Sequence, residues 1–159
     1  MLTTKRNLVG LGASVLLLTG SGFGAAVAQP GGAGDVSARG VHGDSKANAS
    51  YAYAHATWKW TGPGSTGKVK VYVNDQRCRD DYDSFAFMQF KGADGAVITG
   101  ESRAWNENSD CVGRGKTTTF PRFSDGFNVK KARVVVCKND VWGSGDTCKK
   151  GGWHSNPKA

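Results

Sequence analysis

Several motifs of common catalytic chemistry are absent from this 159-residue chain. It has no Gly-x-Ser-x-Gly turn, the motif that presents the nucleophile of many hydrolases. Its 23 glycines are scattered among turns and do not form a phosphate-binding loop. No Cys-x-x-Cys spacing occurs, and no histidine flanks a cysteine at metal-ligand spacing. We therefore expect a protein that binds and does not catalyse, with no cofactor and no metal.

Long hydrophobic runs are also missing, except at the N-terminus. There Lys5–Arg6 precede the apolar stretch Leu8–Leu18, and Ala26–Ala28 has the small-x-small pattern that a signal peptidase cuts. These features predict a signal peptide over residues 1–28. The lack of an Arg-Arg pair favours the general secretory route, and the lack of a nearby cysteine argues against a lipid anchor. The remaining 159 − 28 = 131 residues, beginning at Gln29, are expected to be secreted, extracellular and free of the membrane.

The four cysteines all follow this predicted cleavage site. An even cysteine count in an exported chain is typical of disulfides, and three pairings are possible. We favour Cys78–Cys111 with Cys137–Cys148, because the second pair is close in sequence and is separated by turn-forming residues. Each bridge would stabilise the fold by about 2–4 kcal/mol.

The charge balance is basic. Without the two cations at Lys5–Arg6 there are 21 − 2 = 19 Lys and Arg against 13 Asp and Glu, a net charge of +6. Such a surplus either keeps a secreted protein soluble or attracts it to an anionic cell wall, nucleic acid or an acidic protein. We expect other secreted proteins as partners, and no nucleic acid.

The segment Gln29–Ser50 is rich in glycine, serine and alanine, and Val36 and Val41 are its only branched apolar residues. A segment of this composition buries too little surface to offset its ordering entropy. It is therefore predicted to be a flexible arm, either an inert leader or an element that becomes ordered on a partner. A chain that begins at Tyr51 is expected to fold without it.

From Tyr51 to the end the pattern is typical of an all-β protein. Apolar residues alternate with polar ones, turn formers such as Asp94–Gly95 separate the runs, and no amphipathic helix is evident. Pro121 restricts the preceding strand to a sheet edge or end. We predict one antiparallel β-sandwich domain over 51–159 with about seven strands. They are expected near Tyr51–Trp60, Lys68–Val73, Ser84–Lys91, Ala96–Thr99, Ser102–Asn106, Thr117–Phe120 and Val134–Val136.

Two regions carry the side chains expected to bind a partner. One is the predicted arm with the tyrosines that follow it, and the other is the loop between Cys137 and Cys148. Tyrosine and tryptophan bring large contact area at low entropy cost, which makes them frequent interface anchors. The candidate partner-binding residues are Val36, Val41, Tyr51, Tyr53, Val141 and Trp142.

Two alternatives remain open. His55 is the only histidine on a predicted strand, and with Glu101 or Glu107 beside it the protein would have the acid–base group of a small secreted nuclease. Alternatively, Trp142 and the two tyrosines, Tyr51 and Tyr53, would stack on sugars in a cell-wall or glycan-binding module.

In overall plan the chain resembles the small secreted, two-disulfide β-proteins of Gram-positive actinomycetes. The matched features are the signal peptide, the glycine-rich arm, the β-rich body and the four cysteines. This group includes proteinaceous enzyme inhibitors and the adapter subunit of umbrella toxin particles. The resemblance implies a non-enzymatic binding protein used in bacterial competition. As an adapter, it would join a lectin-like subunit to a toxin-bearing chain.

Overall fold

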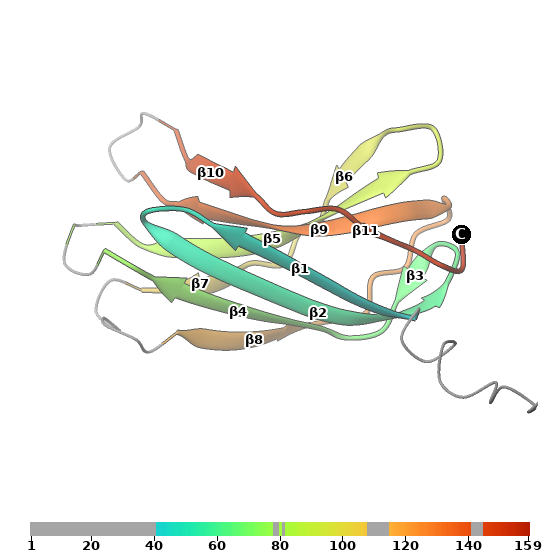
Figure 1. Ribbon diagram of the computed structural model, residues 1–159, viewed down its shortest axis with the longest axis horizontal. Coiled ribbons are helices and arrows are strands. Elements are labelled where there is room, and N and C mark those ends of the chain that lie inside the picture. Colours follow the sequence, from blue (N-terminus) through green and yellow to red (C-terminus); the bar gives the residue numbers. More distant parts are fainter. Residues whose placement is uncertain (1–40, 78–79, 81, 108–114, 141–144) are drawn as a thin grey trace, which may run out of the picture. The chain divides into compact units, whose positions relative to one another are not determined.

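A computed structural model of the chain describes residues 41–77, 80, 82–107, 115–140 and 145–159. The described residues form eleven antiparallel strands in two sheets (Figure 1). The all-β prediction is therefore confirmed, although the strands outnumber the seven predicted. None of the described residues belongs to a helix that could cross a membrane.

The first sheet has the strand order β1-β2-β4-β8, with the short β3 also paired to β2. Its strands are β1 (His42–Asn48), β2 (Ala52–Gly62), β3 (Ser65–Thr66), β4 (Val69–Asp75) and β8 (Lys116–Phe120). The position of β8 at the end of the order confirms the edge strand predicted from Pro121.

The second sheet has the order β10-β9-β5-β6, while β11 pairs with β9 and β7 pairs with β5. Its strands are β5 (Ser84–Gly92), β6 (Val97–Thr99), β7 (Ala104–Asn106), β9 (Val129–Lys138), β10 (Thr147–Lys150) and β11 (His154–Ser155). The predicted turn at Asp94–Gly95 joins β5 to β6, and Gly95 has the positive φ of 87° that such a turn requires.

The main core lies between the two sheets and follows the alternation in the sequence. In β2 the inward residues are the small and indole side chains predicted, and in β4 they are the three valines. In β9 the run Val134–Val136 is buried on both faces, as predicted. Val134 and Val136 face the main core, whereas Val135 joins a smaller cluster on the outer side of the second sheet.

The prediction of a flexible arm over Gln29–Ser50 is wrong for its last part, because His42–Asn48 form strand β1. Gly43, Ser45 and Ala47 are buried and alternate with exposed residues. A Cβ at Gly43 would overlap the indole of Trp58, so a small residue is required there. The low apolar content therefore reflects close packing and not looseness. Residues 29–40 lie outside the described part.

Ser45 ties β1 to the second sheet. Its hydroxyl donates to the carbonyl oxygen of Gly152 at 2.8 Å and accepts from the backbone N–H of Val134 at 3.1 Å. β1 also contacts β9, β10 and β11, and Figure 1 shows it running between β2 and the C-terminal strands. One side of the sandwich is thus closed by β1, and on the opposite side β7 contacts both β4 and β8.

Candidate functional site

The predicted disulfide between Cys137 and Cys148 is confirmed. The two cysteines face each other across β9 and β10, with their Cα atoms 4.1 Å apart. In the sequence, the residues between these two cysteines include Val141 and Trp142. These two residues, together with Val36, Cys78 and Cys111, lie outside the described residues.

His55 lies on the outer face of the first sheet, and its Nε2 is 2.7 Å from Oδ2 of Asp44. The two side chains are 31% and 53% exposed, so the pair is open to solvent. The carboxylate beside His55 is therefore Asp44, on the strand predicted to be a flexible arm, and not Glu101 or Glu107. A general acid–base mechanism also needs a site that holds the reacting bond next to the pair. The pair itself lies on the outer face of the first sheet, where both side chains are open to solvent.

Around His55 the outward side chains of β1, β2 and β4 form a surface that we call the basic face. Asp44 is its single carboxylate among the described outward residues of these strands. Two tyrosine rings, Tyr53 and Tyr72, lie 6.2 Å apart on it. Its charged and aromatic members are His42, Asp44, Lys46, Tyr53, His55, Lys59, Lys70 and Tyr72.

Tyr51 and Val41 were predicted to bind a partner, but both make contacts within the fold. The Tyr51 ring packs against the main core, and its hydroxyl donates to the carbonyl oxygen of Thr147 at 2.9 Å. Burial raises the pKa of the Tyr51 phenol above its usual value. The Val41 carbonyl accepts from the N–H of Trp60 at 2.7 Å and so extends the β1–β2 pairing. Of the described candidates, Tyr53 is the one on an outer sheet face.

A second surface covers the outer side of the second sheet, and we call it the aromatic face. Its centre is Trp105, which is 38% exposed and whose ring lies 4.7 Å from that of Phe85. Phe87 follows at 6.2 Å from Phe85, and the guanidinium carbon of Arg103 lies 4.4 Å above Phe87. The face comprises Phe85, Phe87, Gln89, Arg103, Trp105, Arg133 and Trp153.

The aromatic face leads directly to the disulfide. Trp105 pairs with Phe85 across β7 and β5, Phe85 pairs with Cys137 across β5 and β9, and Cys137 pairs with Cys148 across β9 and β10. This row of four side chains crosses the outer side of the second sheet. Phe85 and Cys137 are buried within it, so Trp105 rests on a packed apolar support.

The arginines of the aromatic face are held in place by neighbouring groups. Both Nε and Nη2 of Arg133 donate to Oε1 of Gln89, at 3.0 and 2.8 Å, and its guanidinium carbon lies 4.0 Å from the Trp153 ring. Desolvation by burial lowers the pKa of Arg133, but an arginine remains charged at any physiological pH. Nη1 of Arg103 donates to the carbonyl oxygen of Gly100 at 2.6 Å.

The aromatic face was not among the predicted sites, although the sequence of β5 carries a signal for it. Phe85 and Phe87 alternate with Ala86, Met88 and Phe90, so both faces of this strand are apolar. A strand of this kind buries one face in the core and needs cover or a partner on the other. Which face is outward depends on the pairing with β7 and β9, and the sequence alone does not reveal that pairing.

Comparisons with known proteins returned no matching family model, no matching curated protein and no matching solved structure. Within the described ranges, no group of three or more His, Cys, Asp or Glu side chains is placed to hold a metal ion.

Proposed function

We propose that this protein is an exported, non-enzymatic binding protein that captures a partner protein on its aromatic face. The observation that carries this proposal is the row from Trp105 through Phe85 to the disulfide Cys137–Cys148. An exposed tryptophan on a buried apolar support, with arginines beside it, is the composition of interface hot spots.

The fixed arginines strengthen this proposal. Arg103 and Arg133 are already held by hydrogen bonds and aromatic rings, so a partner would lose little side-chain entropy by contacting them. Lys150, opposite Val135, adds a third positive charge on the same side. The partner surface should therefore be apolar at its centre and acidic around it.

Within this proposal, the more specific role is that of an adapter in an extracellular antibacterial toxin complex, or of an inhibitor, as the resemblance in overall plan implies. Residues 29–40 and the segment with Val141 and Trp142 remain candidate contacts. In the sequence, the latter segment lies between Cys137 and Cys148, the last two members of the row that begins at Trp105.

The test compares Trp105→Ala with a control, Tyr72→Ala, on the basic face. Tagged chains that begin at residue 29 are incubated with culture medium of the producing organism, and captured proteins are identified by mass spectrometry. Binding of the identified partner is then measured with the purified proteins. Loss of a hot-spot tryptophan should weaken binding by about 30-fold or more, because such residues contribute at least about 2 kcal/mol.

Tyr72→Ala should bind that partner as the unchanged protein does. Equal affinity for the unchanged protein and Trp105→Ala would contradict the proposal. Trp105 is 38% exposed, so the variant should keep the circular dichroism spectrum of the unchanged protein, while its melting temperature falls because the contact with Phe85 is lost. Binding is therefore compared at a temperature at which both proteins are fully folded.

The basic face supports a second candidate function, the binding of an anionic cell-wall polymer or glycan. It holds three lysines and two histidines against one carboxylate, and its two tyrosine rings, Tyr53 and Tyr72, could stack on sugars. Charge attraction and ring stacking differ in their salt dependence, since salt screens only the former.

Pelleting with purified cell wall at low and high salt tests this candidate. The variant Lys59→Ala/Lys70→Ala should lose the salt-sensitive part of binding, and Tyr53→Ala the part that persists in high salt. Trp105→Ala serves as the control and should pellet normally. If both basic-face variants pellet like the unchanged protein, the basic face is not a glycan site.

A further inference from the structure

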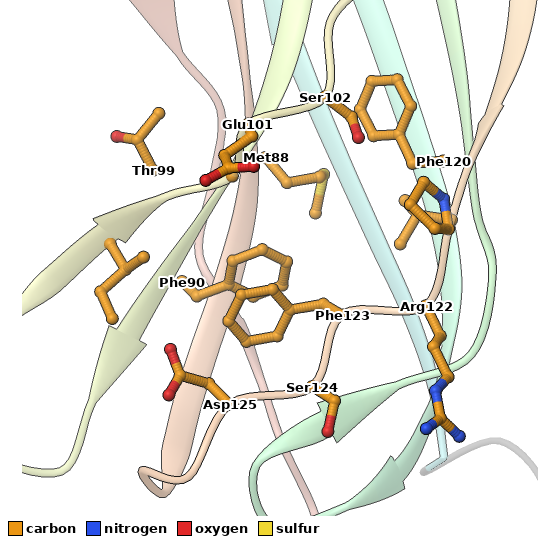
Figure 2. A pocket seen from close by; sticks show the side chains of 14 residues that line it. Met88, Phe90, Thr99, Glu101, Ser102, Phe120, Arg122, Phe123, Ser124 and Asp125 are labelled. Carbon is orange, nitrogen blue, oxygen red and sulfur yellow. The ribbon is translucent and has the colours of Figure 1, made fainter.

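A pocket of about 310 Å³ opens on the side of the sandwich that β1 does not close (Figure 2). Its walls come from the connection between β6 and β7, around Gly100, and from the connection that follows β8, over Phe120–Asp125. This volume is at the lower end of the range for small-ligand pockets, which is about 300–1,000 Å³. None of the functional candidates considered above lies in it, except Glu101.

The floor of the pocket is a pair of stacked phenylalanines. The ring centroids of Phe90 and Phe123 are 3.7 Å apart and their planes differ by 13°. Phe90 is buried, whereas Phe123 is partly exposed, so Phe123 is the ring accessible from outside. Phe127 meets Phe123 edge-on at 6.4 Å and holds it in place. A phenylalanine ring that is fixed in this way attracts apolar chains and cations to its exposed side.

The rim of the pocket carries the opposite charge to most of the protein. Glu101 and Asp125 are exposed, and within the described part of the chain no hydrogen bond or ion pair is recorded for either carboxylate. Figure 2 shows them on two sides of the phenylalanine stack, while the Arg122 side chain extends away from it. Arg103 donates to the backbone carbonyl of Glu101, at 3.2 Å, and to no carboxylate that the structure records.

We propose that this pocket accepts an arginine or lysine side chain from a partner protein. The alkyl stem would lie on Phe123 and Met88, and the cationic head would sit between the carboxylates of Glu101 and Asp125. Charge complementarity selects this occupant, because two carboxylates on either side of an aromatic stack repel an anion and gain nothing from a neutral chain.

The edge strand beside the pocket favours a side chain on an extended segment. Within the described residues no strand pairs with the outer edge of β8, and that strand ends at Phe120 in the pocket wall. A segment that adds to this edge would place every second side chain toward the sandwich interior. The site shares no lining residue with the aromatic face, although Arg103 of that face donates to the backbone of Gly100 and Glu101, and it does not depend on the function proposed above.

The test is an NMR titration of the isotope-labelled chain from residue 29 onward. The probe is the blocked peptide acetyl-Val-Thr-Arg-Thr-Val-amide, and the matched control has citrulline, which is neutral but isosteric, in place of arginine. The arginine peptide should give saturable shift changes at Ile98, Glu101 and Phe123. The citrulline peptide should bind about tenfold more weakly, since two partly exposed ion pairs contribute roughly that factor.

The variant Glu101→Gln/Asp125→Asn should lose this preference for arginine, whereas Glu107→Gln, an exposed carboxylate outside the pocket, should keep it. Trp105→Ala should also keep it, which separates this site from the aromatic face. Equal binding of both peptides, or an unchanged preference in the double variant, would overturn the proposal. So would agmatine binding as tightly as the peptide, because the pocket would then be a site for free amines.

Discussion

Replacing Ser45 by alanine tests whether β1 belongs to the folded core. The Ser45 hydroxyl connects two backbone groups of the second sheet, the carbonyl of Gly152 and the N–H of Val134. Gly152 is exposed, so water can replace the hydroxyl there at a cost of about 0.5–1 kcal/mol. Val134 is fully buried, and its N–H would lose its partner, which costs about 1–3 kcal/mol.

Ser45→Ala should therefore lower the free energy of unfolding by about 1.5–4 kcal/mol, the sum of these two terms. Urea denaturation followed by tryptophan fluorescence measures this change in stability, because Trp58 and Trp60 on β2 are buried in the core. With a slope of about 2 kcal/mol per molar urea, the midpoint should fall by about 1–2 M at unchanged slope. Lys46→Ala is the control, since Lys46 is the exposed neighbour on the same strand.

The control should change stability by no more than about 0.5 kcal/mol. If Ser45→Ala is as mild as Lys46→Ala, residues 42–48 would behave as a loose arm and the assignment of β1 to the core would be wrong. Truncation gives a second readout of the same point. A chain that starts at Val41 should keep its stability, whereas one that starts at Tyr51 should lose the strand and most of the cooperative transition.

Two further predictions concern the region next to the disulfide. Replacing Cys137 and Cys148 together by serine should lower the free energy of unfolding by about 3 kcal/mol, which is the value expected for a closed loop of roughly a dozen residues. Urea denaturation without reductant measures the change, and an unchanged midpoint would contradict this prediction. Tyr51→Phe should be less stable than the unchanged protein at pH 8, and the gap should narrow above about pH 10. The raised pKa of Tyr51 stabilises the fold below the unfolded value of 10.0, and this contribution is lost as the pH rises through the folded pKa. Urea denaturation of both proteins between pH 8 and 11 measures the gap, and a constant gap would refute the reasoning.

Period-two alternation predicted the strands whose inward residues are large or strongly β-prone. Trp58 and Trp60 in β2 and the valines of β4 and β9 face the core as their spacing indicates. These strands obtain their core contacts from their own side chains, so the signal is local in the sequence. The turn at Gly95 was also predicted from a local signal, the Asp94–Gly95 dipeptide, because the positive φ of such a turn favours glycine.

The strand β1 could not be predicted in this way, because its stability comes from its neighbours. Gly43 is small because Trp58 occupies the adjacent space, and Ser45 is buried because its hydroxyl bridges backbone groups far away in sequence. Composition alone made this segment look flexible. Because residues 42–48 were predicted to be flexible, Asp44 was not considered as the hydrogen-bond partner of His55.

The arrangement of the basic face and the aromatic face helps to distinguish the adapter role from the inhibitor role. The basic face and the aromatic face lie on the outer sides of the two sheets, with the common core between them. Packed sheets are about 10 Å apart, so proteins or polymers bound on opposite faces would not collide. An inhibitor needs one such surface, whereas an adapter needs two that can be occupied together. If Trp105→Ala removes one ligand and Tyr53→Ala another, each without affecting the other, the two faces act independently and the adapter role is the better account.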